Sequence, residues 1–331
     1  MAIDYEADCI IVGGGPAGLS CALECTDVRI RPIVLEAGPL IGGQLRITPN
    51  PIRNFAAGIF HDGQELRERI QMAVDALSIE VWTHMPAISI DPVAKTVTAD
   101  GGRQLRGRAI VLATGRRRRS LEVPGAGRFA TSITEEILPD RERFAGLSVA
   151  VVGGGDSACL DALELAPIAR EVHLISRSPA LRARTDIQRA VLAEPKIERW
   201  SGWEIRALAG TDHLESMTIA EAASRIGGAV TDPTGTRDSA GATGASLLRE
   251  IAVDAIVVKI GFAPNTEAFR DKIACNEAGE VLADRGGRTN VPGVFAIGDV
   301  VAGSVWRVAA AVGSGVTVVP AIQQHLSSLL G

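Results

Sequence analysis

The sequence predicts an α/β protein made of two units of the same kind, each a parallel sheet covered by helices. The first observation is the stretch Cys9–Gly18, CIIVGGGPAG, in which an apolar run ends in glycines and leads into a helical pattern. The second is its repeat at Val149–Ala158, VAVVGGGDSA, which places Gly153 140 positions after Gly13. The G-x-G-x-x-G spacing lets a strand turn tightly into a helix whose free N–H groups face a pyrophosphate. Two such turns predict two dinucleotide sites in one chain.

Length and charge agree with this organisation. A chain of 331 residues is long enough for two domains, because a single hydrophobic core stops growing at roughly 250 to 300 residues. The net charge of −5 does not indicate a nucleic acid or an anionic membrane as partner. The sequence shows no export signal and no apolar run of the roughly 18 residues that a membrane helix needs. We therefore expect a cytoplasmic protein without nucleic-acid or membrane partners.

The cysteines do not indicate a disulfide framework or a metal site. There are 5, an odd number, widely scattered and without a C-x-x-C pair. Cys21 and Cys25 stand one turn apart on the first predicted helix, and Cys159 lies on the second. We interpret all three as packed helix positions, since a free cysteine behaves as a small hydrophobic residue. The alternative for Cys159 is a thiol with a pKa lowered by the helix dipole.

The first unit begins with a strand over 8–12 and a helix over 16–26. A second strand, over 32–36, ends in Glu36, 23 positions after Gly13. At this offset an acid accepts hydrogen bonds from adenosine ribose hydroxyls. The alternative is an exposed glutamate at a strand end. The next stretch, 38–54, is too irregular for a helix or strand and too apolar for a linker. We expect it to lie along a large ligand, with polar contacts from Gln44, Thr48 and Asn54.

The rest of the first unit is predicted from shorter signals. Apolar spacing predicts a helix over 63–77, and alternating segments around 80–83, 87–90 and 96–98 predict a small β-meander. A buried strand over 109–113 closes on Thr114–Gly115. Four consecutive arginines, Arg116–Arg119, then mark a domain crossing. They are either solvated or form a surface for an anion or an acidic partner.

The second unit repeats this order, with a strand from Ser148, a helix over 157–166 and a strand over 171–175. The position 23 after Gly153 is Ser176, where the first unit has Glu36. A hydroxyl accommodates a 2′-phosphate that an acid would repel. Basic residues follow it, namely Arg177, Arg182 and Arg184. We therefore expect NADPH rather than NADH at this turn.

The remaining segments complete the prediction. The stretch 222–246 is dominated by Gly, Ala, Ser and Thr, and it predicts a long mobile surface loop. A strand over 254–260 precedes GFAPNT. A strand over 293–297 ends in Gly298–Asp299, and one helical stretch covers 306–330.

These motifs together resemble those of the low-molecular-weight thioredoxin reductases and the related thioredoxin-reductase-like ferredoxin:NADP reductases. In chain order they are GGGPAG, Glu36, GGQL, Asn54, ATG at 113–115, GGGDSA, IGFAPNT and TNVPGVFAIGD. The resemblance implies two Rossmann-like three-layer ββα domains, with an NADPH domain inserted into a discontinuous FAD domain, working as a homodimer. The implied boundaries are 1–117 and 248–331 for the FAD-binding domain and 118–247 for the NAD(P)H-binding domain.

The resemblance also implies which residues contact each cofactor. For FAD they are Gly13, Gly14, Gly15, Pro16, Ala17, Gly18, Glu36, Ala37, Gly43, Gln44, Leu45, Thr48, Asn54, Ala113, Thr114, Gly115, Gly298, Asp299, Arg307 and Val308. Asp299 is the residue that holds the ribityl chain. For NADPH they are Gly153, Gly154, Gly155, Asp156, Ser157, Ala158, Ser176, Arg177, Arg182, Ile260 and Gly261. No side chain is assigned as a catalytic acid or base, because the flavin performs the chemistry.

The chain also departs from the family pattern. Thioredoxin reductases carry C-x-x-C shortly before the second glycine motif, yet 131–144 has no cysteine, so electrons cannot reach thioredoxin by thiol exchange. Val308 replaces a glutamine that lies beside the flavin. The nucleotide motif H-R-R-x-x-x-R is reduced to Ser176–Arg177–Ser178 with Arg182. The ferredoxin:NADP reductases also lack the dithiol, but a C-terminal extension covers their flavin, whereas this chain ends at Gly331.

We therefore expect an FAD-dependent NADPH oxidoreductase that delivers electrons to an acceptor other than a protein dithiol. An acidic electron-transfer protein such as ferredoxin is the leading acceptor, with the arginine row as its docking surface. One alternative is an oxidase or reductase that acts directly on a small molecule or oxygen at an uncovered flavin. The other is a non-catalytic, nucleotide-binding regulatory protein.

Overall fold

The computed structural model describes residues 3–137, 141–222 and 247–330. The chain divides into two compact units. Unit 1 comprises Met1–Arg117 and Phe262–Gly331, and unit 2 comprises Arg118–Gly261. Unit 1 is thus assembled from both ends of the chain and unit 2 from its middle. Within the described ranges, no helix has the length and hydropathy needed to cross a membrane.

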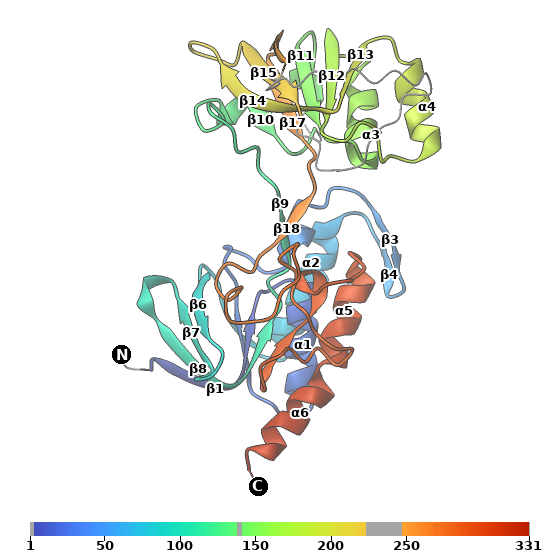
Figure 1. The fold of residues 1–331 in the computed structure, drawn as a ribbon. Helices are drawn as coiled ribbons and strands as arrows, with labels where there is room; N and C mark the ends of the chain where they lie inside the picture. Colours follow the sequence, from blue (N-terminus) through green and yellow to red (C-terminus); the bar gives the residue numbers. More distant parts are fainter. Residues whose placement is uncertain (1–2, 138–140, 223–246, 331) are drawn as a thin grey trace, which may run out of the picture. The chain divides into compact units, whose positions relative to one another are not determined.

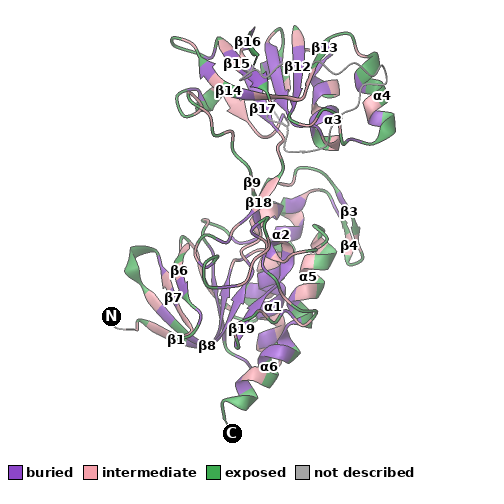
Figure 2. Cartoon of the chain, in the orientation of Figure 1, coloured by how far each residue is buried: buried purple, intermediate pink, exposed green. Residues whose placement is uncertain are grey.

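Unit 1 is organised around a sheet with the strand order β5-β2-β1-β8-β7-β6, in which β19 also pairs with β8 (Figure 1). Its strands are β1 (Tyr5–Val12), β2 (Pro32–Leu35), β5 (Glu80–Trp82), β6 (Ala87–Asp91), β7 (Thr96–Ala99), β8 (Gln104–Leu112) and β19 (Val294–Ala296). Strands β5, β2, β1, β8 and β19 are parallel, so their carboxyl ends share one edge. The central strands are buried on both faces (Figure 2), which explains why they read as unbroken apolar runs.

Two further layers cover this sheet. The helices of unit 1 are α1 (Pro16–Asp27), α2 (Gly63–Ala76), α5 (Val308–Thr317) and α6 (Val319–Ser328). They pack on the face that carries Cys9 and Ile11. On the other face, Ile10 and Val12 pack against β6, β7 and the segment around Phe269. The single helix predicted over 306–330 is two helices, because Pro320 has no N–H to continue the hydrogen-bond ladder.

Two other local predictions for unit 1 need correction. Strand β5 does not join a meander: it pairs in parallel with β2, and the meander is β6-β7-β8. The stretch 38–54 is not wholly irregular, since it contains a 3₁₀ turn, η1 (Gly43–Ile47), and strand β3 (Ile52–Phe55), which forms a hairpin with β4 (Gly58–Phe60). Such a short hairpin is fixed by pairing with its partner strand, which local composition does not reveal.

Unit 2 has the same three kinds of layer. Its parallel sheet has the order β10-β17-β11-β12-β13. These strands are β10 (Ile133–Thr134), β11 (Ser148–Val152), β12 (Glu171–Ser176), β13 (Ile197–Ser201) and β17 (Ala255–Val258). One face carries α3 (Asp156–Leu165) and α4 (Thr185–Ala193). The other carries an antiparallel sheet of β14 (Trp203–Ala209), β15 (Ser216–Glu221) and β16 (Leu248–Ala252). The predicted fold class is confirmed.

The return to unit 1 lies at Gly261–Phe262, later in the chain than the boundary at 247–248 implied by the resemblance. Strands β16 and β17 pair with β15 and β11, which keeps residues 248–261 in unit 2. The crossing segments β9 (Arg116–Arg118) and β18 (Phe262–Pro264) pair with each other. The loop predicted over 222–246 lies, apart from Ala222, outside the described residues.

Candidate functional site

The turn after β1 brings helix α1 directly against the strand ends. Gly13 has a φ of +115°, and a Cβ there would lie 2.3 Å from the carbonyl oxygen of Ala113. A Cβ at Gly18 would lie 2.0 Å from the carbonyl oxygen of Gly13. Neither position has room for a side chain, so glycine alone permits this approach. Pro16 occupies the start of α1, where a missing N–H costs no hydrogen bond.

Gly15, by contrast, faces open space. The nearest atom to a Cβ placed there is the Cα of Gly43, 4.0 Å away. The Gly42 N–H donates to the carbonyl of Gly14 at 2.6 Å, which holds the η1 segment beside the turn. The structure therefore leaves a cradle at the N-terminus of α1, lined by the backbone of Gly15 and Gly43. Free N–H groups and the helix dipole favour an anion in such a cradle.

Glu36 is built into this turn. It is 8% exposed, which contradicts the alternative of an exposed glutamate. Its Oε2 accepts the Gly14 N–H at 2.9 Å, and its Oε1 accepts the Gly38 N–H at 2.7 Å. A carboxylate offers about four lone-pair positions, so about two stay available to hydroxyl donors.

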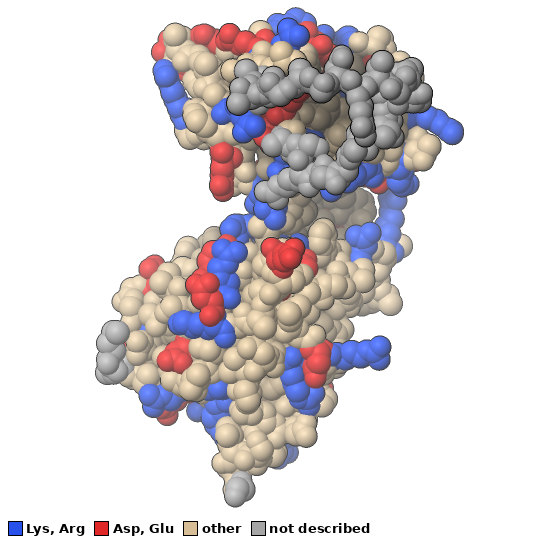
Figure 3. All heavy atoms as spheres, viewed as in Figure 1, with Lys and Arg blue, Asp and Glu red and all other residues tan. Residues whose placement is uncertain are grey.

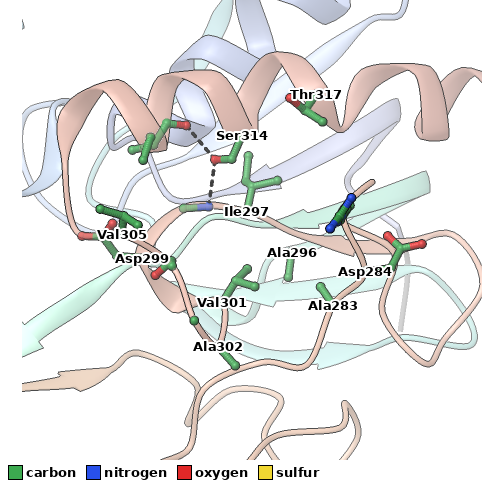
Figure 4. Close-up of a pocket in the computed structure, with 17 residues that line it drawn as sticks. Ala283, Asp284, Ala296, Ile297, Asp299, Val301, Ala302, Val305, Ser314 and Thr317 are labelled. Carbon is green, nitrogen blue, oxygen red and sulfur yellow. Dashed lines mark hydrogen bonds between the residues drawn. The ribbon is translucent and has the colours of Figure 1, made fainter. Parts of the chain in front are cut away.

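Asp299 lies on the other side of α1. It belongs to the turn η5 (Gly298–Val300), and a Cβ on Gly298 would lie 2.8 Å from the Cβ of Ala17. The Gly298 N–H donates to the hydroxyl of Ser314 on α5 at 3.1 Å (Figure 4). Burial raises the pKa of the Asp299 carboxyl, while Arg116 and a hydrogen bond from Gln44 oppose that rise. The Gln44 Nε2 is 3.4 Å from Asp299 Oδ2, so the fold unites two predicted FAD contacts 255 positions apart.

A cavity of about 350 Å³ adjoins Asp299 within unit 1 (Figure 4). Its walls come from α5, from the end of β19 and from the segments around Asp284 and Ala302. The hydroxyl oxygen of Ser304 is buried in this region and has no hydrogen-bond partner in the described part of the chain. The cavity therefore offers a polar atom to a ligand that extends from Asp299.

The ATG segment is fixed by a residue that we did not single out. Thr114 Oγ1 donates to the carbonyl of Asn265 at 2.6 Å, and Asn265 Nδ2 donates to the carbonyl of Thr114 at 2.8 Å. The Asn265 N–H also donates to the carbonyl of Gly115 at 3.0 Å. The signal was present, because Asn265 stands inside the GFAPNT motif.

Other predicted FAD contacts serve the packing of unit 1 or lie at its surface. Leu45 is buried in a small apolar cluster, and Val308 packs against that cluster where the family has a polar glutamine. Thr48 Oγ1 donates to the carbonyl of Gln44 at 2.9 Å. The exposed members of the set are Ala37, Asn54 and Arg307.

The second glycine turn repeats the first. Gly153 has a φ of +145°, and a Cβ there would lie 2.4 Å from the carbonyl oxygen of Lys259. A Cβ at Gly155 would meet no described atom within 4 Å. Asp156, at the start of α3, accepts hydrogen bonds from the main-chain N–H and the Nε of Arg184 at 2.8 and 3.1 Å. A second open cradle thus lies at the N-terminus of α3, beside a carboxylate paired with an arginine.

Ser176 takes the place of Glu36 in this unit. It is buried, its Cβ would lie 3.1 Å from a Cβ on Gly154, and its hydroxyl donates to the carbonyl of Ser178 at 3.0 Å. The hydroxyl proton is thus already used inside the protein. Arg177 and Arg182 are exposed, and the Arg182 N–H donates to the carbonyl of Gly154 at 2.7 Å. The guanidinium groups, rather than the Ser176 O–H donor, are therefore the groups open to a phosphate.

The arginine row is neither simply solvated nor a free docking surface. Arg116 is buried and pairs with Glu280. Arg117 pairs with Glu267 at 2.7 Å, and Arg118 pairs with Glu136. On the face shown in Figure 3, blue and red side chains lie next to one another. Three of the four arginines thus have acidic partners inside their own unit.

The cysteines are packing residues, as predicted. Cys21 and Cys25 are fully buried, with their Sγ atoms 4.0 Å apart. Cys159 is also fully buried, and burial raises the pKa of its thiol, which contradicts the alternative of an activated thiolate. Among the residues that the structure describes, no group of His, Cys, Asp and Glu could hold a metal ion.

Known proteins share this architecture and these motifs. Residues 7–315 match the family model described as pyridine nucleotide-disulphide oxidoreductase. Thioredoxin reductase of Peptoclostridium acidaminophilum is 29% identical over 311 residues, which are 93% of this chain and 93% of that protein. An alkyl hydroperoxide reductase component from Pseudomonas putida is 30% identical over 324 residues, or 96% of this chain, which spans only 58% of that relative. The crystal structure of Lactococcus lactis thioredoxin reductase in its FR conformation superimposes with a TM-score of 0.76 at 25% identity, covering 97% of this chain and 99% of that one.

Proposed function

Because the chain belongs to the pyridine nucleotide-disulphide oxidoreductase family, we propose that it transfers electrons from NADPH through FAD to an acceptor other than a protein dithiol. FAD and NADPH are the cofactors of the family. The observation that carries the proposal is the pair of glycine turns, which differ where it matters: Glu36 stands beside one and Ser176–Arg177 beside the other. The acceptor follows from the sequence, because none of the 5 cysteines forms the C-x-x-C pair that thiol exchange needs.

Unit 1 fits FAD. The open cradle at Gly15 suits a pyrophosphate, and the remaining lone pairs of Glu36 suit ribose hydroxyls. On the other side of α1, the Asp299 carboxylate suits the hydroxyls of a ribityl chain, and the unpaired Ser304 oxygen suits a further polar group. When bound, FAD supplies the hydride acceptor and the electron carrier. The residues of this chain bind it and orient it.

Unit 2 fits NADPH. Its cradle at Gly155 is open, and Arg184 balances the carboxylate of Asp156 that lies beside it. Exposed Arg177 and Arg182 follow the strand end at which a 2′-phosphate would lie. Guanidinium groups bind phosphate through paired, charge-assisted hydrogen bonds. We therefore assign unit 1 to FAD and unit 2 to NADPH.

Within the class of non-dithiol acceptors, a ferredoxin-like carrier remains the first to test, and it rests on the missing dithiol alone. The internal pairing of Arg116, Arg117 and Arg118 removes the support that the arginine row gave to it. We also propose a cytoplasmic homodimer. The uncharged helix α5, with Ala309, Ala310 and Val316 exposed, gives the chain an apolar surface for a second copy.

Anaerobic stopped-flow mixing of the FAD-loaded protein with NADPH and with NADH tests this function. We expect NADPH to bleach the flavin absorbance faster than NADH. Reoxidation is then followed with thioredoxin, ferredoxin, a small-molecule acceptor and oxygen in turn. Rapid reoxidation by thioredoxin contradicts the proposal, and a flavin that NADPH cannot bleach leaves only a non-catalytic role. Fast reoxidation by ferredoxin, slowed by salt, supports the protein carrier, and fast turnover with oxygen or a small molecule supports direct reduction.

A further inference from the structure

Arg116 is a buried cation at the point where the chain leaves β8. It is 7% exposed, and a charge removed from water needs both a counter-charge and hydrogen bonds. Its partners come from three segments of unit 1. The guanidinium pairs with the Glu280 carboxylate, its Nε donates to the main-chain carbonyl of Asp299 at 2.7 Å, and its central carbon lies 4.3 Å from the ring centroid of Trp306.

These partners are themselves fixed. The Glu280 Oε2 accepts a hydrogen bond from Asn276 Nδ2 at 2.7 Å, and the Glu280 N–H donates to Asn276 Oδ1 at 2.9 Å. The ring of Trp306 packs against Phe262, with their centroids 6.2 Å apart. Since neither the acid nor the indole can move away freely, the guanidinium has one place in the fold.

Through these contacts Arg116 holds the Asp299 turn from two directions. One contact is to the carbonyl of Asp299 itself. The other runs through Trp306, which stands two positions before the first residue of α5, and α5 in turn holds the Gly298 N–H through Ser314. A shift of Arg116 would therefore move the carboxylate that we assign to the ribityl chain.

We propose that Arg116 is a positioning residue of the flavin site, which fixes the Asp299 turn and places a cation beside its carboxylate. This inference rests on the proposed function, because it concerns the group assigned to FAD. It also gives a role to the first residue of the arginine row, which neither solvation nor partner docking explains.

The proposal has an electrostatic consequence. The groups that face the Asp299 carboxyl are Arg116 from β9 and the Gln44 amide from η1, with Glu280 behind Arg116. Burial raises the pKa of Asp299 and Arg116 lowers it. The ionised carboxylate is the better acceptor for ribityl hydroxyls, so FAD is held less tightly as the pH falls through this pKa. Without Arg116 that midpoint moves to higher pH.

The test measures FAD retention by the holoprotein, from the fluorescence of FAD released on dilution between about pH 5 and about pH 8. Arg116→Met leaves Glu280 buried without a counter-charge, so the decisive variant is the double substitution Arg116→Met/Glu280→Met, which leaves no unpaired ion. Arg117→Met is the matched control: it also breaks an arginine–glutamate pair, but that pair is half exposed and does not contact Asp299. Arg116→Lys keeps the charge but loses the planar group that stacks on Trp306.

We expect the double variant to hold FAD about 10- to 100-fold more weakly, the loss typical of a hydrogen bond from a charged group. Its pH midpoint should lie above that of the wild type. Arg116→Lys should keep the wild-type midpoint with weakened retention, and Arg117→Met should match the wild type in both. Equal retention and an equal midpoint in the double variant and the wild type overturn the inference. A wild-type protein that binds no FAD instead overturns the proposed function, so the two failures are distinguishable.

Discussion

At the residue scale, the two cofactor turns differ at one pair of equivalent positions. Glu36 and Ser176 both follow the second strand of their unit and both lie against the middle glycine of a turn. Glu36 uses two backbone N–H donors to hold a buried carboxylate in place. Ser176 is small enough to pack under Gly154, and it leaves phosphate recognition to the arginines that follow. A single position thus separates an acid for ribose hydroxyls from a site open to a 2′-phosphate.

This difference predicts the effect of removing the arginines. Arg177→Ala and Arg182→Ala should each raise the KM for NADPH by about tenfold, the loss of one charge-assisted hydrogen bond, and leave the KM for NADH unchanged. Steady-state rates of flavin-dependent dye reduction with both nucleotides measure this. Arg189→Ala on α4, an exposed arginine outside the predicted set, is the control. An equal rise for both nucleotides would show that the arginines do not read the 2′-phosphate.

At the element scale, the strand-to-helix turns use their glycines for two different purposes. Gly13, Gly18 and Gly153 allow the backbone to approach within distances that no side chain tolerates. Gly15 and Gly155 have ordinary backbone angles, with φ of −80° and −94°, and face open space. The first group is needed for the fold, whereas the second keeps the cradle clear for a ligand.

Alanine substitutions separate the two purposes. Gly18→Ala should destabilise the protein by about 3 kcal/mol or more, because its methyl group meets a main-chain oxygen. Gly15→Ala and Gly155→Ala should change stability by about 1 kcal/mol at most. They should nevertheless weaken FAD and NADPH binding, respectively, because the methyl group fills the cradle. Thermal unfolding and cofactor titration of the three variants check this, and unimpaired FAD binding by Gly15→Ala would place the pyrophosphate elsewhere.

At the scale of the whole molecule, each unit has its own hydrophobic core. In unit 2, apolar residues on both faces of the parallel sheet pack within the unit, against α3 and α4 on one side and β14–β16 on the other. Unit 2 is also continuous in the chain, whereas unit 1 needs both ends. A domain of this size buries enough surface to fold alone.

We therefore expect residues 118–261 to fold as a separate fragment and to bind NADP⁺ but not FAD. Circular dichroism with thermal unfolding tests the fold, and retention on immobilised 2′,5′-ADP tests the site. The same fragment with Arg177→Ala is the control for specific retention. A fragment that folds and binds FAD instead would reverse the assignment of cofactors to units.

The sequence alone determined the architecture of each turn and the order of the main elements, because these depend on short-range patterns. Glycine spacing and apolar runs predicted β1, α1, β11 and α3, and the strand end at Glu36 could be located by counting. The absence of C-x-x-C is likewise a property of the sequence. Where local signals conflicted with partners far away in the chain, prediction failed, as for β5, which pairs with β2, and for the return to unit 1 at Gly261.

The tertiary structure alone decided what the charged residues do. In the sequence, Arg116 to Arg118 are identical neighbours, and nothing local separates them. Their partners Glu280, Glu267 and Glu136 lie 164, 150 and 18 positions away, so only the folded chain assigns one to each. Burial then gives each pair a different weight, because a charge is costly to remove from water and cheap to leave there. Hence Arg116, one of four alike in the sequence, is the one that the fold places beside Asp299.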